Sequence, residues 1–164
     1  MYSSFDAEQF KAIFRAHPAG VAIITLDDDT QPMGFTATSV ISVSASPPVI
    51  VFSVQGSSSS LTALQRAQSV IIHFLDQRHQ PLAQRFATPG IDRFSGIDWS
   101  RLPTDEPLLS GIDTWVRCTL IERTVAGSSL LVQASPAHGA AGEERSPIIY
   151  HDRGFCGLAA LVSP

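Results

Sequence analysis

Residues 34–44 read Gly34-Phe35-Thr36-Ala37-Thr38-Ser39-Val40-Ile41-Ser42-Val43-Ser44, and the paired prolines Pro47-Pro48 follow soon after. β-Branched residues are abundant here and glycine and proline bound the segment, which predicts a β-strand over residues 35–43. The hydroxyl residues have two interpretations. Either they line the polar face of a strand, or they form a row of small hydrogen-bond donors that a flat ring or a phosphate can approach closely.

Similar runs lie on both sides of this segment. Stretches rich in valine and isoleucine, separated by turn residues, predict further strands at 21–26, 49–54, 70–75, 114–124, 129–135 and 148–151. The runs lack the regular alternation with helices that a parallel sheet requires. Closing an antiparallel sheet into a barrel removes its exposed edges. The sequence therefore predicts a mainly β protein, an antiparallel barrel with short flanking helices.

Three short helices are expected around the strands. Apolar residues at helical spacing between Phe5 and Phe14, with Ser4 or Asp6 as candidate N-caps, predict an amphipathic helix that packs on another surface. Helix formers at 60–67 and 80–87 predict two more, one on each side of the strand at 70–75. All three are too short to build a helical core.

Length and composition narrow the class of protein. The 164 residues suit one domain, spanning 1–164, and 44% hydrophobic residues predict a folded chain. A net charge of −4 without a lysine or arginine run gives little attraction for nucleic acid or an anionic membrane. The N-terminus has no signal-peptide pattern and no apolar run is long enough to span a bilayer, so we expect a cytoplasmic protein.

Common catalytic motifs are missing from the sequence. It contains no P-loop, no dinucleotide-binding G-x-G-x-x-G, no G-x-S-x-G and no H-E-x-x-H. The five histidines form no helical pair and no cluster with cysteine, so we expect no metal site. An enzyme built on this chain would borrow its chemistry from a cofactor.

A second hydroxyl-rich stretch, Gly56-Ser57-Ser58-Ser59-Ser60, directly precedes the helix expected at 60–67. Serines at a helix start are ordinarily caps. Together with the helix N-terminus, however, they offer hydroxyl and backbone N–H donors for an anion.

The order of these features along the chain resembles that of the flavin reductase-like family of FMN-binding split barrels. The resemblance is carried by Gly20-Val21, residues 34–44 with Pro47-Pro48, Ser58-x-Ser60, His73-Phe74-Leu75, Arg85-Phe86-Ala87, Asp92-Arg93-Phe94, Trp99, Pro107-Leu108 and Pro147-Ile148-Ile149-Tyr150-His151. It implies a six-stranded antiparallel split barrel that forms a homodimer and binds FMN or FAD near the dimer interface. Many members reduce flavin with NADH or NADPH on behalf of a monooxygenase.

The resemblance also implies roles for individual residues. Thr36, Ala37, Thr38 and Ser39, with Ser53 on the next strand, match positions along the isoalloxazine and ribityl chain of the flavin. Ser58 and Ser60 match the phosphate end. Arg85 and Phe86 match a helix end that closes over the flavin, although Phe86 also suits the core and Arg85 a surface ion pair.

One position departs from the family pattern. Many members have Gly-Asp-His before a late strand, with the histidine near the nicotinamide, whereas this chain reads Gly127-Ser128-Ser129. Ser129 and His151 are therefore the candidates for a catalytic position, His151 because relatives also place residues of the last strands close to the site.

Three functions remain open at this point. The first is an NAD(P)H-dependent flavin reductase that supplies a monooxygenase. The second is a flavin-binding carrier or sensor that does not oxidise NAD(P)H, which the missing histidine favours. The third is a split barrel that binds another cofactor.

Overall fold

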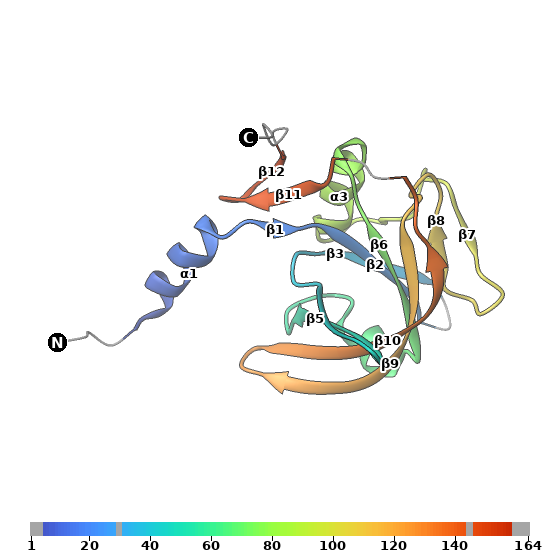
Figure 1. The fold of residues 1–164 in the computed structure, drawn as a ribbon, viewed down its shortest axis with the longest axis horizontal. Coiled ribbons are helices and arrows are strands. Elements are labelled where there is room, and N and C mark those ends of the chain that lie inside the picture. The colour runs from blue at the N-terminus through green and yellow to red at the C-terminus, as the bar shows by residue number, and fades with distance from the viewer. Residues whose placement is uncertain (1–4, 29–30, 144–145, 159–164) are drawn as a thin grey trace.

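The expected mainly β antiparallel architecture is confirmed by the structure, a computed structural model that describes residues 5–28, 31–143 and 146–158 (Figure 1). Within these residues the main sheet has seven antiparallel strands in the order β3-β2-β6-β9-β10-β5-β4. Their bounds are β2 Ala22–Asp27, β3 Pro32–Ala37, β4 Ile41–Ala45, β5 Pro48–Gln55, β6 Ser69–Phe74, β9 Trp115–Ala126 and β10 Ser129–Ala140. Two small sheets flank it: β1 (Ala19–Gly20) with β11 (Ile148–His151) and β12 (Gly154–Gly157), and β7 (Trp99–Arg101) with β8 (Pro107–Leu109).

The strand predicted over residues 35–43 is in fact two strands, and this is one reason the main sheet has seven strands rather than six. The chain leaves β3 after Ala37 and re-enters the sheet as β4 at Ile41, at the opposite edge of the strand order. Between them, the hydroxyl of Ser39 donates to the carbonyl oxygen of Ser53 at 3.1 Å and accepts from the Ser53 N–H at 2.9 Å. One side chain thus joins the end of β3 to β5 where no ladder of backbone hydrogen bonds continues. We call this place the seam.

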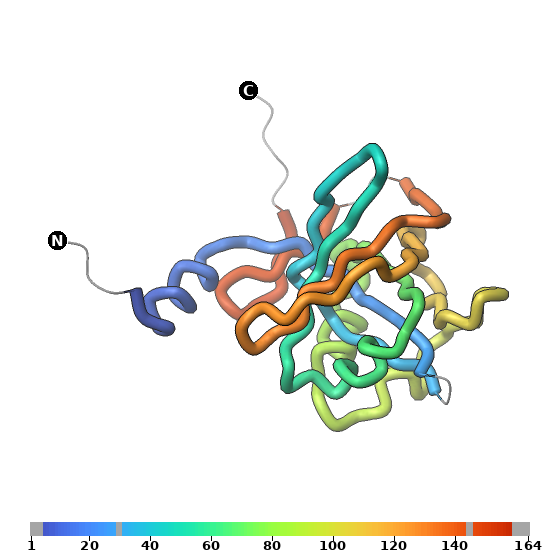
Figure 2. Tube along the Cα trace, turned by 90° about the horizontal axis from the view of Figure 1, so that it is seen from below, coloured from blue at the N-terminus to red at the C-terminus, as the bar shows by residue number. Residues whose placement is uncertain are grey.

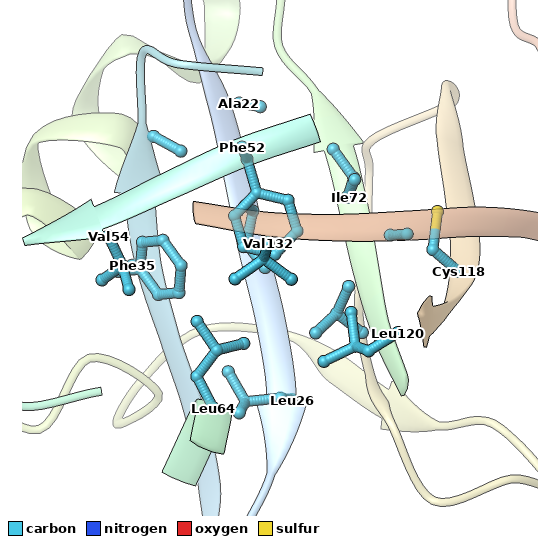
Figure 3. Packing of buried hydrophobic residues seen from close by; sticks show 14 of the residues in the cluster. Ala22, Leu26, Phe35, Phe52, Val54, Leu64, Ile72, Cys118, Leu120 and Val132 are labelled. Carbon is cyan, nitrogen blue, oxygen red and sulfur yellow. The ribbon is translucent and has the colours of Figure 1, made fainter. Parts of the chain in front are cut away.

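The barrel interior is filled by alternate residues of the strands. In β5, Phe52 and Val54 point inward while Ser53 between them points to the seam, because successive side chains of a strand face opposite sides. Figure 3 shows Phe35, Phe52 and Val132 converging in the middle of this core. The helix α2 (Leu61–Arg66) adds Ala63 and Leu64 to it.

A second apolar cluster lies on the outer side of β2. All residues of β2 from Ala22 to Leu26 are buried, because Ile24 and Leu26 face the interior while Ile23 faces the second cluster. The helix α3 (Gln80–Ala87), at the predicted bounds, supplies Ala83 and Phe86 to this cluster. It follows a 3-10 turn, η1 (Gln77–His79).

The first helix, α1 (Ala7–Ala16), extends away from the barrel (Figure 1), and Figure 2 shows the same from below. Asp6 is its N-cap, in a reciprocal pair with Gln9: the Asp6 carboxylate accepts the Gln9 N–H at 2.8 Å and the Gln9 side chain accepts the Asp6 N–H at 3.0 Å. Ser4, the other candidate cap, lies outside the described residues. No residue of α1 is buried, so the described chain leaves its apolar side largely uncovered.

Candidate functional site

A hollow of about 490 Å³ opens at the seam of the barrel, which we call the seam hollow. Its size falls in the usual range for small-molecule sites. It is lined by the predicted cofactor residues Thr36, Ala37, Thr38, Ser39, Ser53, Ser58 and Phe86, and also by Ser57, Ser59, Gly90 and Arg93. Segments far apart in the sequence therefore meet where the barrel is split, and most of their side chains are small or carry a hydroxyl.

Contacts with α3 set the wall of the hollow. Thr36 donates its hydroxyl to the Ala83 carbonyl at 2.6 Å, which fastens β3 to the helix. A Cβ on Gly34 would come within 2.7 Å of the Phe86 ring, so the glycine allows that ring to lie against β3. Phe86 is fully buried and meets Phe94 edge to face at 5.2 Å. The core role and the lining role of Phe86 thus coexist.

The cation of the seam hollow is Arg93 rather than Arg85. Arg85 does not line it, because its guanidinium donates to backbone carbonyls of Arg93 at 2.8 Å, of Asp92 at 3.0 Å and of Ser95. It therefore holds the loop in which Arg93 lies. Arg93 lines the hollow while donating to the Gly34 carbonyl at 2.7 Å and the Thr88 carbonyl at 3.1 Å.

Burial lowers the pKa of Arg93 from its ordinary value, yet a guanidinium stays protonated at any physiological pH. Its guanidinium donates to carbonyl oxygens, which do not neutralise a full charge. The residues around Arg85 and Arg93 do not indicate which of the two arginines lines the site. The only signal for Arg93 was the place of Asp92-Arg93-Phe94 in the family order.

The two predicted phosphate-end serines have different positions. Ser58 lines the seam hollow, and its hydroxyl accepts the Ser60 N–H at 3.3 Å. Ser60 is fully buried at the start of α2, does not line the hollow, and its hydroxyl has no hydrogen-bond partner among the described residues. The helix α2 has only six residues and no side-chain cap, so its terminus is not an anion site. The hydrogen-bond donors that line this end of the seam hollow are the serine hydroxyls and Arg93.

A second hollow, of about 760 Å³, adjoins the first and shares Thr38 and Ser39 with it. It lies between α1, the segment 38–41 and the β11–β12 hairpin, and it contains Tyr150 and the candidate His151. Aromatic and basic side chains line much of it, so we call it the basic hollow.

Ser129 lines neither hollow. It is the first residue of β10, where it pairs with Ala126 on one side and with Gln55 on the other. Gln55 itself lines the seam hollow, so Ser129 lies one strand away from it. The structure thus does not bring the two catalytic candidates together.

A third hollow, of about 640 Å³, contains none of the predicted site residues. Three of its charged side chains have partners within the fold: Arg101 pairs with Asp27, and the buried Glu106 accepts from Arg117 at 2.8 Å and from Ser69 and Thr104. Desolvation opposes the ionisation of Glu106, but these hydrogen bonds outweigh it and hold the pKa of the carboxyl below its ordinary value. The buried carboxylate of Glu106 is therefore satisfied within the fold.

The described residues also bear on metal binding and on membrane spanning. No group of three histidine, cysteine or acidic side chains is placed to bind a metal ion in that part of the chain. Among the same residues, no helix has the length and hydrophobicity needed to cross a bilayer.

A barrel with a nucleotide-sized hollow at its split defines the class of protein. The family model described as a flavin reductase like domain matches residues 14–159, and the chain belongs to this family. A protein of Rhodococcus erythropolis named NADH:FMN oxidoreductase is 40% identical over 151 residues, which cover 89% of this chain and 79% of the relative. The reductase subunit HsaB of a flavin-dependent monooxygenase from Rhodococcus jostii is 26% identical over 155 residues, covering 94% and 80%.

Solved structures give the same result. The crystal structure of a flavin reductase domain protein from Arthrobacter sp. FB24 superposes with a TM-score of 0.91 at 35% identity, covering 96% of this chain and 99% of the other. The resemblance inferred from the sequence is therefore confirmed, in family and in fold.

Proposed function

We propose that residues 1–164 form a single-domain NAD(P)H-dependent flavin reductase that takes FMN or FAD and NADH or NADPH. The observation that carries the proposal is the seam hollow, in which the residues matched to the family's flavin contacts meet although they come from separate segments. Family membership and the relative named NADH:FMN oxidoreductase support it.

The residues of the seam hollow fit a flavin. The hydroxyls of Ser57, Ser58 and Ser59 and the charge of Arg93 suit the phosphate, since charge-assisted hydrogen bonds are the strong ones. The small side chains of Ala37 and Ser39 leave room beside the backbone for a flat ring. The buried edge of Phe86 and the closed core behind it exclude water from that side.

Bound nicotinamide and flavin nucleotides would themselves supply the chemistry, a hydride transfer from the dihydronicotinamide that reduces the flavin. The protein needs no nucleophile for this step and contributes orientation. Ser129 stands where many members of the family have a histidine. Because Ser129 lines neither hollow, its lack of an imidazole does not remove a group from the surfaces that would orient the nucleotides. Thr38 and Ser39 border both hollows, which supports a contact between the two nucleotides at these residues.

Anaerobic mixing of the protein with NADH or NADPH and FMN or FAD tests the proposal. We expect the flavin absorption near 450 nm, the usual band of an oxidised flavin, to bleach faster than without protein. Flavin binding without faster bleaching would identify the carrier or sensor function instead, and a purified protein with a non-flavin spectrum would identify a barrel for another cofactor.

Variants of two arginines sharpen this test. Arg93→Met removes the cation of the seam hollow and should weaken FMN binding about tenfold, as expected for one lost hydrogen bond to a charged group. Arg66→Met is the matched control, because Arg66 is exposed at the end of α2 and does not line the seam hollow. Equal FMN affinity in both variants would contradict the assignment of the phosphate end.

We further propose that the protein acts as a homodimer in the cytoplasm and passes reduced flavin to a monooxygenase. The exposed apolar side chains Phe10, Phe14 and Ile41, which border one hollow, support a second copy as the cover of this face. The relative named as a monooxygenase reductase subunit supports the partner.

A further inference from the structure

The cation of the seam hollow lies on a loop, residues 88–98, that forms neither helix nor strand between α3 and β7. Two glycines in the left-handed region, Gly90 with φ of 75° and Gly96 with φ of 71°, flank the part of the loop that contains Arg93. Glycine has more backbone freedom to lose than any other residue. This part of the loop therefore depends on contacts from outside to keep one conformation.

Arg85, in the last turn of α3, makes such contacts. Its side chain is half-buried, and its guanidinium donates from Nε to the Arg93 carbonyl at 2.8 Å. From Nη2 it donates to the carbonyls of Asp92 at 3.0 Å and of Ser95. None of these acceptors is a carboxylate, so the guanidinium acts here as a rigid fork of donors that fits the backbone of the loop.

Asp92 holds the same part of the loop through its N–H groups. Its Oδ1 accepts the N–H of Phe94 at 3.0 Å and the N–H of Ser95 at 3.2 Å. Carbonyls and N–H groups on both sides of Arg93 thus have partners, and the backbone from which its side chain extends is fixed.

The Arg93 side chain is oriented in turn by its bonds to the carbonyls of Gly34 and Thr88. An arginine that is already ordered loses less conformational entropy when it binds an anion. Arg85 does not line the seam hollow, so any effect it has on a ligand there passes through Arg93.

We propose that Arg85 is a positioning residue for the phosphate of the flavin, and that it sets how strongly the site prefers FMN to riboflavin. Riboflavin has the same ring and ribityl chain but no phosphate. The inference rests on the proposed function and deepens it. The family resemblance implied that Arg85 closes over the flavin, whereas the geometry gives it the loop that carries Arg93.

The test compares Arg85→Met with the unmodified protein in fluorescence titrations of FMN and of riboflavin, which require no turnover. We expect FMN to bind about fivefold more weakly, because the long Arg93 side chain must now be ordered on binding, and riboflavin to bind equally well. In the double variant Arg85→Met/Arg93→Met, FMN should bind as it does to Arg93→Met alone, because both residues act through one contact.

Arg123→Met is the matched control. Arg123 is also half-buried and donates to backbone carbonyls, of Leu64 at 2.9 Å and of Ala67, but these belong to α2 and its end, outside the seam hollow. The control should lower the melting temperature and leave both affinities unchanged. Arg85→Lys, which keeps the charge without the fork, provides a second comparison if Arg85→Met does not fold, and should show a smaller loss of FMN affinity.

The proposal is overturned if Arg85→Met weakens FMN and riboflavin equally or weakens neither, or if the two substitutions lower FMN affinity additively. An unmodified protein that binds riboflavin as tightly as FMN would overturn it as well. Flavin binding with the expected pattern, but without reduction by NADH or NADPH, would contradict the proposed function alone and support this inference.

Discussion

At the scale of single residues, His73 shows how the fold uses a polar side chain in its core. The ring is fully buried, with Nδ1 at 3.2 Å from the Ile23 carbonyl and Nε2 accepting the Leu109 N–H at 3.1 Å. Because Nε2 accepts a backbone N–H, the proton lies on Nδ1 and the ring is neutral. It connects β6 to β2 and β8 and, as a structural residue, lies outside both hollows.

We predict that His73 makes the protein less stable in mild acid. Burial lowers the pKa of His73 from 6.5 to about 4, so between these values the unfolded chain binds the proton and the folded chain does not. Stability is therefore lost as the pH falls, by about 3 kcal/mol between pH 6.5 and pH 4. Urea unfolding at several pH values measures this, and His73→Asn should show a smaller loss over the same range. Parallel curves for the two proteins would contradict the prediction.

Gly34 is the second residue with a specific consequence. In Gly34→Ala the new Cβ would lie 2.7 Å from the Phe86 ring and 3.1 Å from the Ile24 carbonyl oxygen. We expect a loss of about 1–3 kcal/mol in the free energy of unfolding, as for other overpacked cores. Gly20→Ala is the matched control, since nothing lies within 4 Å of its Cβ, and thermal unfolding of both variants measures the difference. A similar melting temperature for the two variants would show that Phe86 gives way freely.

At the scale of elements, an ion pair fastens the segment before β8 to β9. Glu106 is buried and Arg117 of β9 is largely covered, with 2.8 Å between their charged atoms. Replacing Glu106 by Gln leaves the Arg117 charge without its carboxylate, and we expect a loss of about 3 kcal/mol in stability.

The pair of Arg78 and Asp76, in which the arginine side chain is exposed, is the control for this prediction. Arg78→Ala should cost less than about 1 kcal/mol, because solvent screens that pair. Chemical denaturation measures the loss in the free energy of unfolding for each variant. Equal losses would show that burial does not make the Glu106–Arg117 pair more important for stability than the Arg78–Asp76 pair.

Elements differ in how far the sequence predicted them. The helix at 80–87 was predicted with its bounds, because its apolar spacing and flanking residues are local signals. The break at 38–40 was missed because it depends on the contact of Ser39 with Ser53, far away in the chain. The strand β12 was missed because two of its four residues are glycines, which are poor strand formers.

The residues of the candidate site also differ in how far the sequence predicted them. The row of small hydroxyl residues at 36–39 was identified from composition and family order, and it lines the seam hollow. Arg85 was assigned from the family match at the helix end, and nothing in the local pattern tells which of two nearby arginines faces a cavity. The basic hollow was not predicted at all, since its cations come from both ends of the chain and only the fold brings them together.

At the scale of the whole molecule, the apolar side of α1 predicts self-association. Phe14 is 56% exposed on a helix that extends from the barrel. With a chain mass of 17.6 kDa, light scattering should give about twice that value for the unmodified protein. Phe14→Asp should give a monomer, because a charge in an apolar interface is costly to bury.

Ile91→Asp is the control for the dimer, since Ile91 is 45% exposed but lies on the loop after α3 rather than beside α1. It should keep the mass of the unmodified protein. A monomeric unmodified protein would contradict the dimer, while a dimeric Phe14→Asp would place the interface elsewhere on the surface.

The single hydroxyl at the seam also bears on how the barrel fluctuates. A continuous strand ladder opens cooperatively, whereas a junction made by Ser39 alone opens without disturbing the rest of the sheet. In Ser39→Ala the Ser53 amide loses its acceptor, so its hydrogen should exchange with deuterium faster than the amide of Phe52, which serves as the internal reference. A ligand seated at the seam should slow that exchange in the unmodified protein, which makes the Ser53 amide a local reporter of occupancy that requires no turnover.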